Sequence, residues 1–555
     1  SNYTLQGVAT LDEGKRQARA LFGGANGSSW VQFDNVPRHL GTKLHAWVRE
    51  IPWTGQIGDS APPRLITEQD VTVRNGSVSF DFGGALPSLK ESSAYEVVLT
   101  PAGGASRTTV TPDLWEGGYE AEDAKYTGSG YSRNGPEGSP SDVSKFYTSG
   151  GYNVGGLRTG SDGVLDFSVD VPKAGRYDLS VFANSLNTDA RVSEQGPTNV
   201  FVRVDGGAEQ ELFLPLGYKW VVWDHADTTV ELTAGKHVIS LAARSLDGSK
   251  ATKGDAIVDR VTLALPNPKA AKVVYEAELA ELAGARPVYD AAHARCDVSG
   301  SGVVDIAKNG TVTFWVYSPA DAESTVEVHT TGGQAALAVN GRQVLKVDSG
   351  SSKVAVSLSG GVNKVTVTGK SRSTLLDRIE VEQTSGRLAA KTYEAEAARL
   401  AGTAKASPFT LAGGGSAVEG VGGEPGNANT LTFQVTAEET GSYAMRVRYA
   451  NRERSEATHY NPDPLAQHAD ISVNGAGAQR VLFPHTFHGN NFWEITVPVE
   501  LKKGKNTISF RSEELPNFDG TTYASDTFPG ALLRSRYAPI VDRITIARFH
   551  SSRLR

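Results

Sequence analysis

The chain has 555 residues, of which 55 are Lys or Arg and 62 are Asp or Glu, so its formal net charge is −7. This balance argues against nucleic acid as the main partner, because nucleic-acid affinity rests on clustered Lys and Arg. No stretch approaches 18 consecutive apolar residues, so no membrane span is predicted, and the single cysteine, Cys296, excludes an internal disulfide.

Short apolar runs rich in β-branched residues recur along the chain and end at Gly, Asn, Asp or Pro, and glycine alone accounts for 60 residues. This composition is typical of many strands joined by turns. The length allows about four domains of ordinary size. The sequence therefore predicts an all-β protein with several domains.

The first 115 residues predict one small all-β domain. Asn75-Gly76 and Gly83-Gly84 are turn signals, and a short helix is expected at 11–21. Alternating apolar and polar residues predict strands at 31–36, 43–51, 71–82 and 95–100.

The pattern Tyr-Glu-Ala-Glu occurs three times, and each copy is followed far downstream by Asp-Arg in an apolar strand. The spacing between the two patterns differs from copy to copy, as expected of one fold with different loops. Most of the chain is therefore predicted to be three copies of one domain. The copies begin at Tyr119, Tyr275 and Tyr393, and the Asp-Arg pairs are Asp259-Arg260, Asp377-Arg378 and Asp542-Arg543.

The acidic residues of these patterns predict a metal site in each copy. In an extended strand alternate side chains share a face, so both glutamates of Glu-Ala-Glu should project together. An Asp from the last strand would complete a site of oxygen ligands, which Ca²⁺ prefers, and would tie the first strand to the last. Paired glutamates on a solvated face are the simpler reading of one copy, but three copies with a matching Asp favour the metal. The predicted ligands are Glu120, Glu122 and Asp259, then Glu276, Glu278 and Asp377, then Glu394, Glu396 and Asp542.

These patterns resemble carbohydrate-binding modules of families 6 and 35. Further shared marks are Ala-Gly-Arg-Tyr-Asp-Leu-Ser-Val at 174–181, the turn at 232–239, and their counterparts at 440–443 and 501–508. The resemblance covers residues 116 to 548 and implies jelly-roll β-sandwiches, a structural Ca²⁺ at the Glu/Glu/Asp site and sugar binding by loops.

Residues 1–115 resemble a different domain, the β-sandwich that follows the (β/α)₈ barrel in glycoside hydrolases similar to family 39. The resemblance rests on the stretches 44–49, 51–55 and 93–101. The resemblance implies a catalytic barrel as a partner in the same precursor. The barrel is not in this sequence, because no alternating strand–helix pattern is present.

A sugar-binding site needs aromatic side chains that stack on the apolar face of a pyranose. It also needs amide, acidic or basic groups that bind the hydroxyls. Two copies carry such residues at corresponding loop positions. Trp220 and Trp223 are an odd spacing apart, so one of them should be a packing residue. In the first copy the candidates are Asn184, Tyr218, Trp220, Trp223, Asp224, His225, Lys253 and Asp255. In the third copy they are Asn451, Arg452, His488, Asn490, Asn491, Trp493, Arg534, Arg536 and Tyr537.

The middle copy differs from its neighbours. Its one tryptophan, Trp315, lies in a strand-like run and is expected in the core, and its loops are short. This copy is predicted to be a spacer that keeps its metal and binds no sugar.

The sequence as a whole predicts four consecutive β-sandwich domains of the jelly-roll type: 1–115, an accessory sandwich, and then segment 1 (116–268), segment 2 (269–386) and segment 3 (387–555). No nucleophile elbow, zinc-protease motif or phosphate loop is present, so no catalytic residue is predicted. The chain begins without Met, which suggests a processed product or a fragment, and secretion is expected. The predicted function is carbohydrate binding within a secreted polysaccharide-degrading hydrolase. The alternatives are an extracellular structural or adhesion protein and a glycoside hydrolase in its own right.

Overall fold

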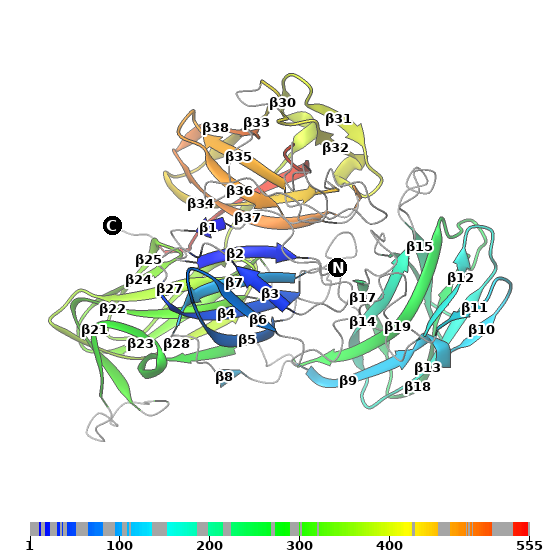
Figure 1. Cartoon of the computed structure of the whole chain (residues 1–555), viewed down its shortest axis with the longest axis horizontal. Coiled ribbons are helices and arrows are strands. Elements are labelled where there is room, and N and C mark those ends of the chain that lie inside the picture. Colours follow the sequence, from blue (N-terminus) through cyan, green and yellow to red (C-terminus); the bar gives the residue numbers. More distant parts are fainter. Residues whose placement is uncertain are drawn as a thin grey trace.

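The structure is a computed structural model, and the part of the chain that it describes is almost entirely β (Figure 1). The helical elements in this part are single 3₁₀ turns, so the predicted all-β class is confirmed. No helix within the described residues is long and apolar enough to cross a membrane. The described residues are 10–12, 17–22, 30–33, 36, 41–50, 65–81, 95–102, 108–109, 113–135, 152–185, 198–214, 224–267, 272–288, 299, 302–318, 321–423, 428–452, 467–483, 486, 489–490, 492–512 and 537–552.

The N-terminal region contains a five-stranded antiparallel sheet and a two-stranded one. The expected helix at 11–21 is wrong, because Thr10–Asp12 and Gln17–Phe22 are paired strands. The turn at Asn75-Gly76 is confirmed: both residues have positive φ, 51° and 77°, as a two-residue hairpin turn requires. The large sheet has the order β1 (Thr10–Asp12), β2 (Gln17–Phe22), β7 (Tyr95–Pro101), β4 (Lys43–Glu50) and β5 (Leu65–Thr72), and the small one pairs β3 (Trp30–Phe33) with β6 (Val78–Asp81).

Segment 1 consists of two antiparallel sheets around a shared apolar core. Alternation along Val164–Val171 buries Leu165, Phe167 and Val169 against residues of the facing sheet. One sheet has the order β10 (Lys125–Thr127), β13 (Val164–Val171), β18 (Gly235–Ala242), β15 (Asn199–Val204) and β16 (Glu209–Phe213). The other has the order β11 (Ser132–Asn134), β12 (Asn153–Arg158), β19 (Asp255–Pro266), β14 (Gly175–Ser185) and β17 (Asp224–Leu232), with β9 (Asp113–Glu120) paired to β19 and followed by the turn η4 (Ala121–Asp123).

Each of the two sheets of segment 3 has the same strand order as the corresponding sheet of segment 1. The first contains β30 (Arg399–Leu400), β33 (Leu431–Ala437), β38 (Gly504–Arg511), β35 (Gln467–Val473) and β36 (Gln479–Phe483). The second contains β31 (Lys405–Pro408), β32 (Ser416–Glu419), β39 (Ile540–Arg548), β34 (Gly441–Ala450) and β37 (Trp493–Leu501), with β29 (Ala390–Glu394) paired to β39. Its 3₁₀ turns are η8 (Ala395–Ala397) and η9 (Gly413–Gly415).

In segment 2 the strands form one continuous sheet, and one long strand, β22 (Val303–Ser318), belongs to both halves of it. The first half of β22 pairs with β28 (Ser373–Gln383) and its second half with β27 (Gly361–Gly369). The other strands are β20 (Lys272–Glu276), β21 (Glu281–Val288), β23 (Ala322–Thr331), β24 (Ala335–Val339), β25 (Arg342–Val347) and β26 (Gly350–Leu358), and η6 (Ala277–Leu279) follows β20.

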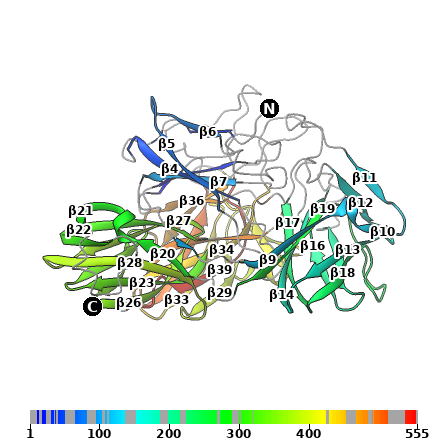
Figure 2. The same ribbon diagram turned by 90° about the horizontal axis from the view of Figure 1, so that it is seen from below.

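Segment 2 also contacts both the N-terminal sheet and segment 3, as the two views show (Figures 1 and 2). On the N-terminal side, β8 (Thr108–Thr109) adds to the edge of β20, and Trp315 is buried in one cluster with Trp47. On the other side, Phe549 lies in the apolar core of segment 2. Direct packing therefore holds these three parts together, in addition to the linkers.

Candidate carboxylate clamps and loop sites

The two sequence patterns meet in all three segments. The first Glu of each Glu-Ala-Glu ends its strand directly opposite the Arg of the Asp-Arg pair, at Glu120↔Arg260, Glu276↔Arg378 and Glu394↔Arg543. The second Glu is not in the strand, because a 3₁₀ turn begins after the first. The expectation of a continuous strand through Glu-Ala-Glu is thus wrong, yet the turn keeps the second carboxylate near the first.

The tightest cluster of three carboxylates is in segment 3. One oxygen from each of Glu394, Glu396 and Asp542 lies within 4.8 Å of the others. We call each set of two glutamates and one aspartate a clamp, and among the described residues only the clamp of segment 3 is so compact. Asp542 is fully buried. The Oε2 atoms of Glu394 and Glu396 are buried and accept no hydrogen bond. Burial, with Asp542 and Glu396 nearby, raises the pKa of Glu394 above its usual value.

A glycine turn, η9, closes this cluster. The backbone N–H of Gly413 donates to Asp542 Oδ1 at 2.9 Å, and Arg448 Nη1 donates to Oδ2 at 2.5 Å. A Cβ on Gly414, which has φ of 65°, would lie 3.3 Å from Glu396 Oε1. The run Gly413-Gly414-Gly415 therefore lets the main chain approach the carboxylates, and three consecutive glycines were the available sequence signal.

This donor set fits a hard cation. It offers oxygen atoms only, two of them are buried without a hydrogen bond, and Ca²⁺ takes such ligands together with main-chain carbonyls and water. Arg448 already neutralises part of the charge on Asp542, so Glu394 and Glu396 have the most available oxygens.

In segment 1 the corresponding carboxylates are Glu120, Glu122 and Asp259. Asp259 is fully buried, and Glu122 Oε2 is buried without a hydrogen bond. Burial, together with the charges of Glu120 and Asp123, raises the pKa of Glu122 to about 7. A cation bound beside Glu122 would favour its charged form and so lower this pKa.

In segment 2 protein groups occupy the clamp. Ser299 Oγ donates to Glu276 Oε2 at 2.8 Å, and the Ser299 N–H approaches both oxygens of Asp377 at 3.2 Å. Arg378 Nη1 lies 2.5 Å from Asp377 Oδ2, and Glu278 is buried. Burial raises the pKa of Glu276 although the Ser299 hydrogen bond lowers it. This clamp therefore has fewer available oxygens than that of segment 3.

Several predicted sugar contacts lie outside the described residues. They are Tyr218, Trp220, Trp223, His488, Asn491, Arg534 and Arg536, and the side chains of Asn184 and Asp224.

The described candidates of segment 1 lie at one end of the sandwich. Lys253 is exposed, and burial raises the pKa of Asp255 although Arg158 lowers it. His225 is mostly buried: its Nδ1 lies 2.7 Å from Asp227 Oδ1 and its ring is 5.1 Å from that of Phe182. His225 thus has a packing role that the sequence did not indicate.

The candidates of segment 3 divide into packing and exposed residues. Trp493 is 3% exposed and belongs to the core, so its predicted role as a sugar platform is wrong. Asn451 is fully buried, and its Nδ2 donates to the carbonyl of Phe483 at 3.1 Å. Asn490 Oδ1 accepts from the N–H of Leu411. Asn451 and Asn490 therefore hold neighbouring stretches of the main chain, whereas Trp493 packs in the core.

Two candidates of segment 3 remain accessible. Tyr537 is 43% exposed, and its ring covers Gly423, where a Cβ would lie 2.6 Å from the ring. Arg452 pairs with Glu419 at 3.1 Å and lies over the ring of Phe409. An exposed aromatic ring and an exposed guanidinium are the group types that sugar recognition uses.

Trp315 of segment 2 is fully buried, as predicted, but not in the core of its own segment. It shares a cluster with Trp47, Val98 and Val362. Its burial thus depends on the N-terminal sheet.

No family model matches the chain. It is 26% identical to a 3-O-β-L-arabinopyranosyl-α-L-arabinofuranosidase of Bifidobacterium pseudocatenulatum, over 90% of this chain and 55% of that protein. It is also 26% identical to a 3-O-α-D-galactosyl-α-L-arabinofuranosidase of Bifidobacterium longum subsp. longum, over 91% of this chain and 47% of that protein. The chain thus spans about half the length of the curated relatives it matches.

Solved structures give shorter matches. A family 35 carbohydrate-binding module from Clostridium thermocellum is 31% identical, covers 28% of this chain and 98% of its own, and has a TM-score of 0.22. An exo-β-1,3-galactanase from Phanerochaete chrysosporium is 16% identical over 56% of this chain and 74% of its own, also with a TM-score of 0.22.

Proposed function

We propose that the chain is the carbohydrate-binding part of a secreted glycoside hydrolase whose catalytic barrel belongs to the same precursor. The observation that carries this proposal is the similarity to two arabinofuranosidases along nine-tenths of the chain, which spans only half of their length. The motif resemblance to carbohydrate-binding modules supports the same function. Arabinose- or galactose-containing polysaccharides are therefore the first ligands to test.

Calcium is the proposed structural ion of the clamps. Bound there, Ca²⁺ would neutralise the gathered carboxylates and tie the first strand of a segment to its last. The compact Glu394–Glu396–Asp542 cluster supports this role best, and the segment 2 clamp supports it least because Ser299 and Arg378 already occupy Asp377.

Sugar binding is assigned to the loop ends of segments 1 and 3. Lys253 and Asp255 in segment 1 and Tyr537 and Arg452 in segment 3 are the described residues that support it. Two binding segments on one chain would raise retention on a polymer through effective concentration.

A glycan array probed with the full chain in Ca²⁺ tests the proposal. We expect binding to arabinose- or galactose-containing glycans and no release of sugar from them. A folded chain that binds no glycan would instead favour a structural or adhesion protein, and sugar release by the chain alone would favour catalysis.

A further inference from the structure

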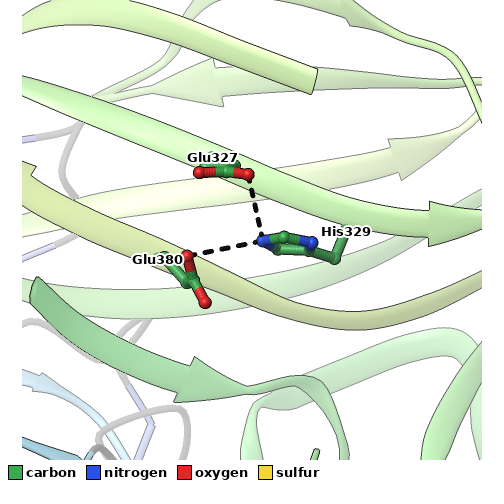
Figure 3. Close-up of side chains that lie close together, drawn as sticks. All are labelled: Glu327, His329 and Glu380. Carbon is green, nitrogen blue, oxygen red and sulfur yellow. Dashed lines mark ion pairs between the residues drawn. The ribbon is translucent and has the colours of Figure 1, made fainter. Parts of the chain in front are cut away.

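Two glutamates and a histidine converge on the outer face of the sheet in segment 2 (Figure 3). Glu327 and His329 lie two residues apart on β23, so their side chains share a face. Glu380 on β28 is directly opposite Glu327 in the strand register. Like charges directly opposite each other in a sheet destabilise it, so this pair needs a compensating group.

The imidazole lies between the two carboxylates at distances too long for hydrogen bonds. His329 Nε2 is 3.4 Å from Glu327 Oε1 and 3.5 Å from Glu380 Oε2, whereas N–H···O bonds measure about 2.7–3.2 Å. This nitrogen is buried and has no hydrogen-bond partner. In a tetrahedral Zn²⁺ site with bonds of about 2.0–2.2 Å, neighbouring ligand atoms are about 3.3–3.6 Å apart. The two separations from His329 fall in this range, and one oxygen of each carboxylate lies within 4.8 Å of the other.

The shared fold does not require these three residues. The Arg of each Asp-Arg pair is opposite Phe182 in segment 1, His329 in segment 2 and Arg448 in segment 3, which aligns the three sheets. The cross-strand pair at the position of Glu327 and Glu380 is Ser180 with Thr262 in segment 1 and Arg446 with Thr545 in segment 3. The acid–histidine–acid set is thus a property of segment 2.

We propose that Glu327, His329 and Glu380 bind Zn²⁺, with water or a ligand oxygen in the fourth position. Imidazole with carboxylates suits Zn²⁺, whereas Ca²⁺ prefers oxygen ligands alone. Neighbouring donors would orient the ligands: Ser351 Oγ donates to Glu327, and Arg378 Nε donates to Glu380 Oε1 at 3.1 Å. This site is independent of the sugar-binding proposal.

Two lysines compete with the metal for the carboxylates. Lys272 Nζ is 3.2 Å from Glu380 Oε2, and Lys353 Nζ is 3.6 Å from Glu327 Oε2. Their side chains are 47% and 56% exposed, so both can turn into solvent when the ion binds. Because Lys272 contacts the proposed ligand oxygen, its removal should strengthen zinc binding.

The test is a calorimetric titration of the full chain, stripped of metal and then saturated with Ca²⁺, with Zn²⁺ at about pH 7.5. We expect one Zn²⁺ per chain whose affinity falls at least about tenfold in His329→Gln and in Glu380→Gln, as for lost ligands, and rises in Lys272→Met. His237→Gln is the matched control, because His237 Nδ1 lies beside a single carboxylate, Asp205, in segment 1, and it should leave the titration unchanged.

Zinc binding that is the same in the wild type and in both ligand variants would overturn the site. So would the absence of binding in both the wild type and Lys272→Met, which would identify the cluster as an ion-pair network only. Melting curves in chelator show whether each variant is folded. If His329→Gln and Glu380→Gln do not fold, X-ray absorption of the zinc-loaded wild type decides: one imidazole with oxygen ligands supports the site, and two or more imidazoles contradict it.

Discussion

Trp47 of the N-terminal sheet and Trp315 of segment 2 are buried in the same apolar cluster, with exposures of 1% and 0%. Trp47 is fixed from its own side, because its Nε1 donates to Thr100 Oγ1 at 3.0 Å and His45 packs against its ring edge. The N-terminal sheet and segment 2 therefore share a packed apolar interface.

The first prediction follows from this contact. Trp315→Ala should cost about 3–5 kcal/mol of stability, and Trp47→Ala a similar amount, as for large-to-small changes in a core. Because both mutations open the same cluster, the double variant should cost less than the sum of the two. Denaturant unfolding of the four proteins measures the coupling. Additivity within about 0.5 kcal/mol would show that the two side chains do not support each other.

How well the sequence predicts a contact in this structure depends on how far apart the two residues are along the chain. The pairing of Glu394 with the strand of Asp542 could be predicted, because two patterns recurring in the same order indicate two ends of one fold. The approach of Gly413 to Asp542 could not, because it joins residues 129 positions apart through a loop without periodicity. Apolar patterning likewise predicts that Trp315 is in a strand, but not which surface covers its ring. Trp493, predicted at a loop position, instead begins β37 and packs in the core.

The second prediction concerns calcium. Chelation should lower the melting temperature, since an ion bound only by the folded state stabilises it by about 2.7 kcal/mol at a hundredfold excess over Kd. Glu394→Gln with Glu396→Gln should reduce this response, because it removes the two available oxygens of the compact clamp. Thermal unfolding with and without Ca²⁺ measures the effect. The matched control is Glu419→Gln, in the same segment but paired with Arg452, which should respond as the wild type does.

The third prediction concerns pH in the metal-free protein. The pKa of Glu122 is about 7 when folded, against an ordinary value of 4.5, so the folded state binds this proton more tightly than the unfolded one. Its contribution to stability therefore falls as pH rises from about 4.5 to 7, and the loss is complete above that range. In EDTA, Glu122→Gln should flatten the decline in melting temperature between pH 5 and 7.5, whereas the exposed Glu231→Gln should not. Equal slopes for Glu122→Gln and the wild type would refute the assignment.

The fourth prediction separates a ligand contact from a packing residue. Tyr537→Ala should weaken binding to an arabinose- or galactose-containing glycan by at least about 1 kcal/mol and leave melting nearly unchanged, because the ring is 43% exposed. Trp493→Ala should instead cost about 3–5 kcal/mol of stability. Glycan titration and melting are measured on each variant. Normal glycan binding by Tyr537→Ala would show that Tyr537 is not part of the glycan site.

The last prediction concerns the join between segments 2 and 3. The chain after β39 adds to the edge of β26: the N–H of Ser357 donates to the Phe549 carbonyl and that of Ser551 to the Ala355 carbonyl, both at 2.9 Å. Between these bonds the Phe549 ring, 4% exposed, enters the core of segment 2.

Phe549→Ala should therefore destabilise segment 2, although the mutated residue belongs to segment 3, by about 3–5 kcal/mol if the cavity does not collapse. Hydrogen exchange read by peptide measures where the loss falls, and we expect faster exchange in β26 and β23. Tyr131→Ala, an exposed aromatic of segment 1, is the control. If exchange accelerates only in β39 and its neighbours, the two segments are joined by the linker alone and the edge pairing does not couple their stability.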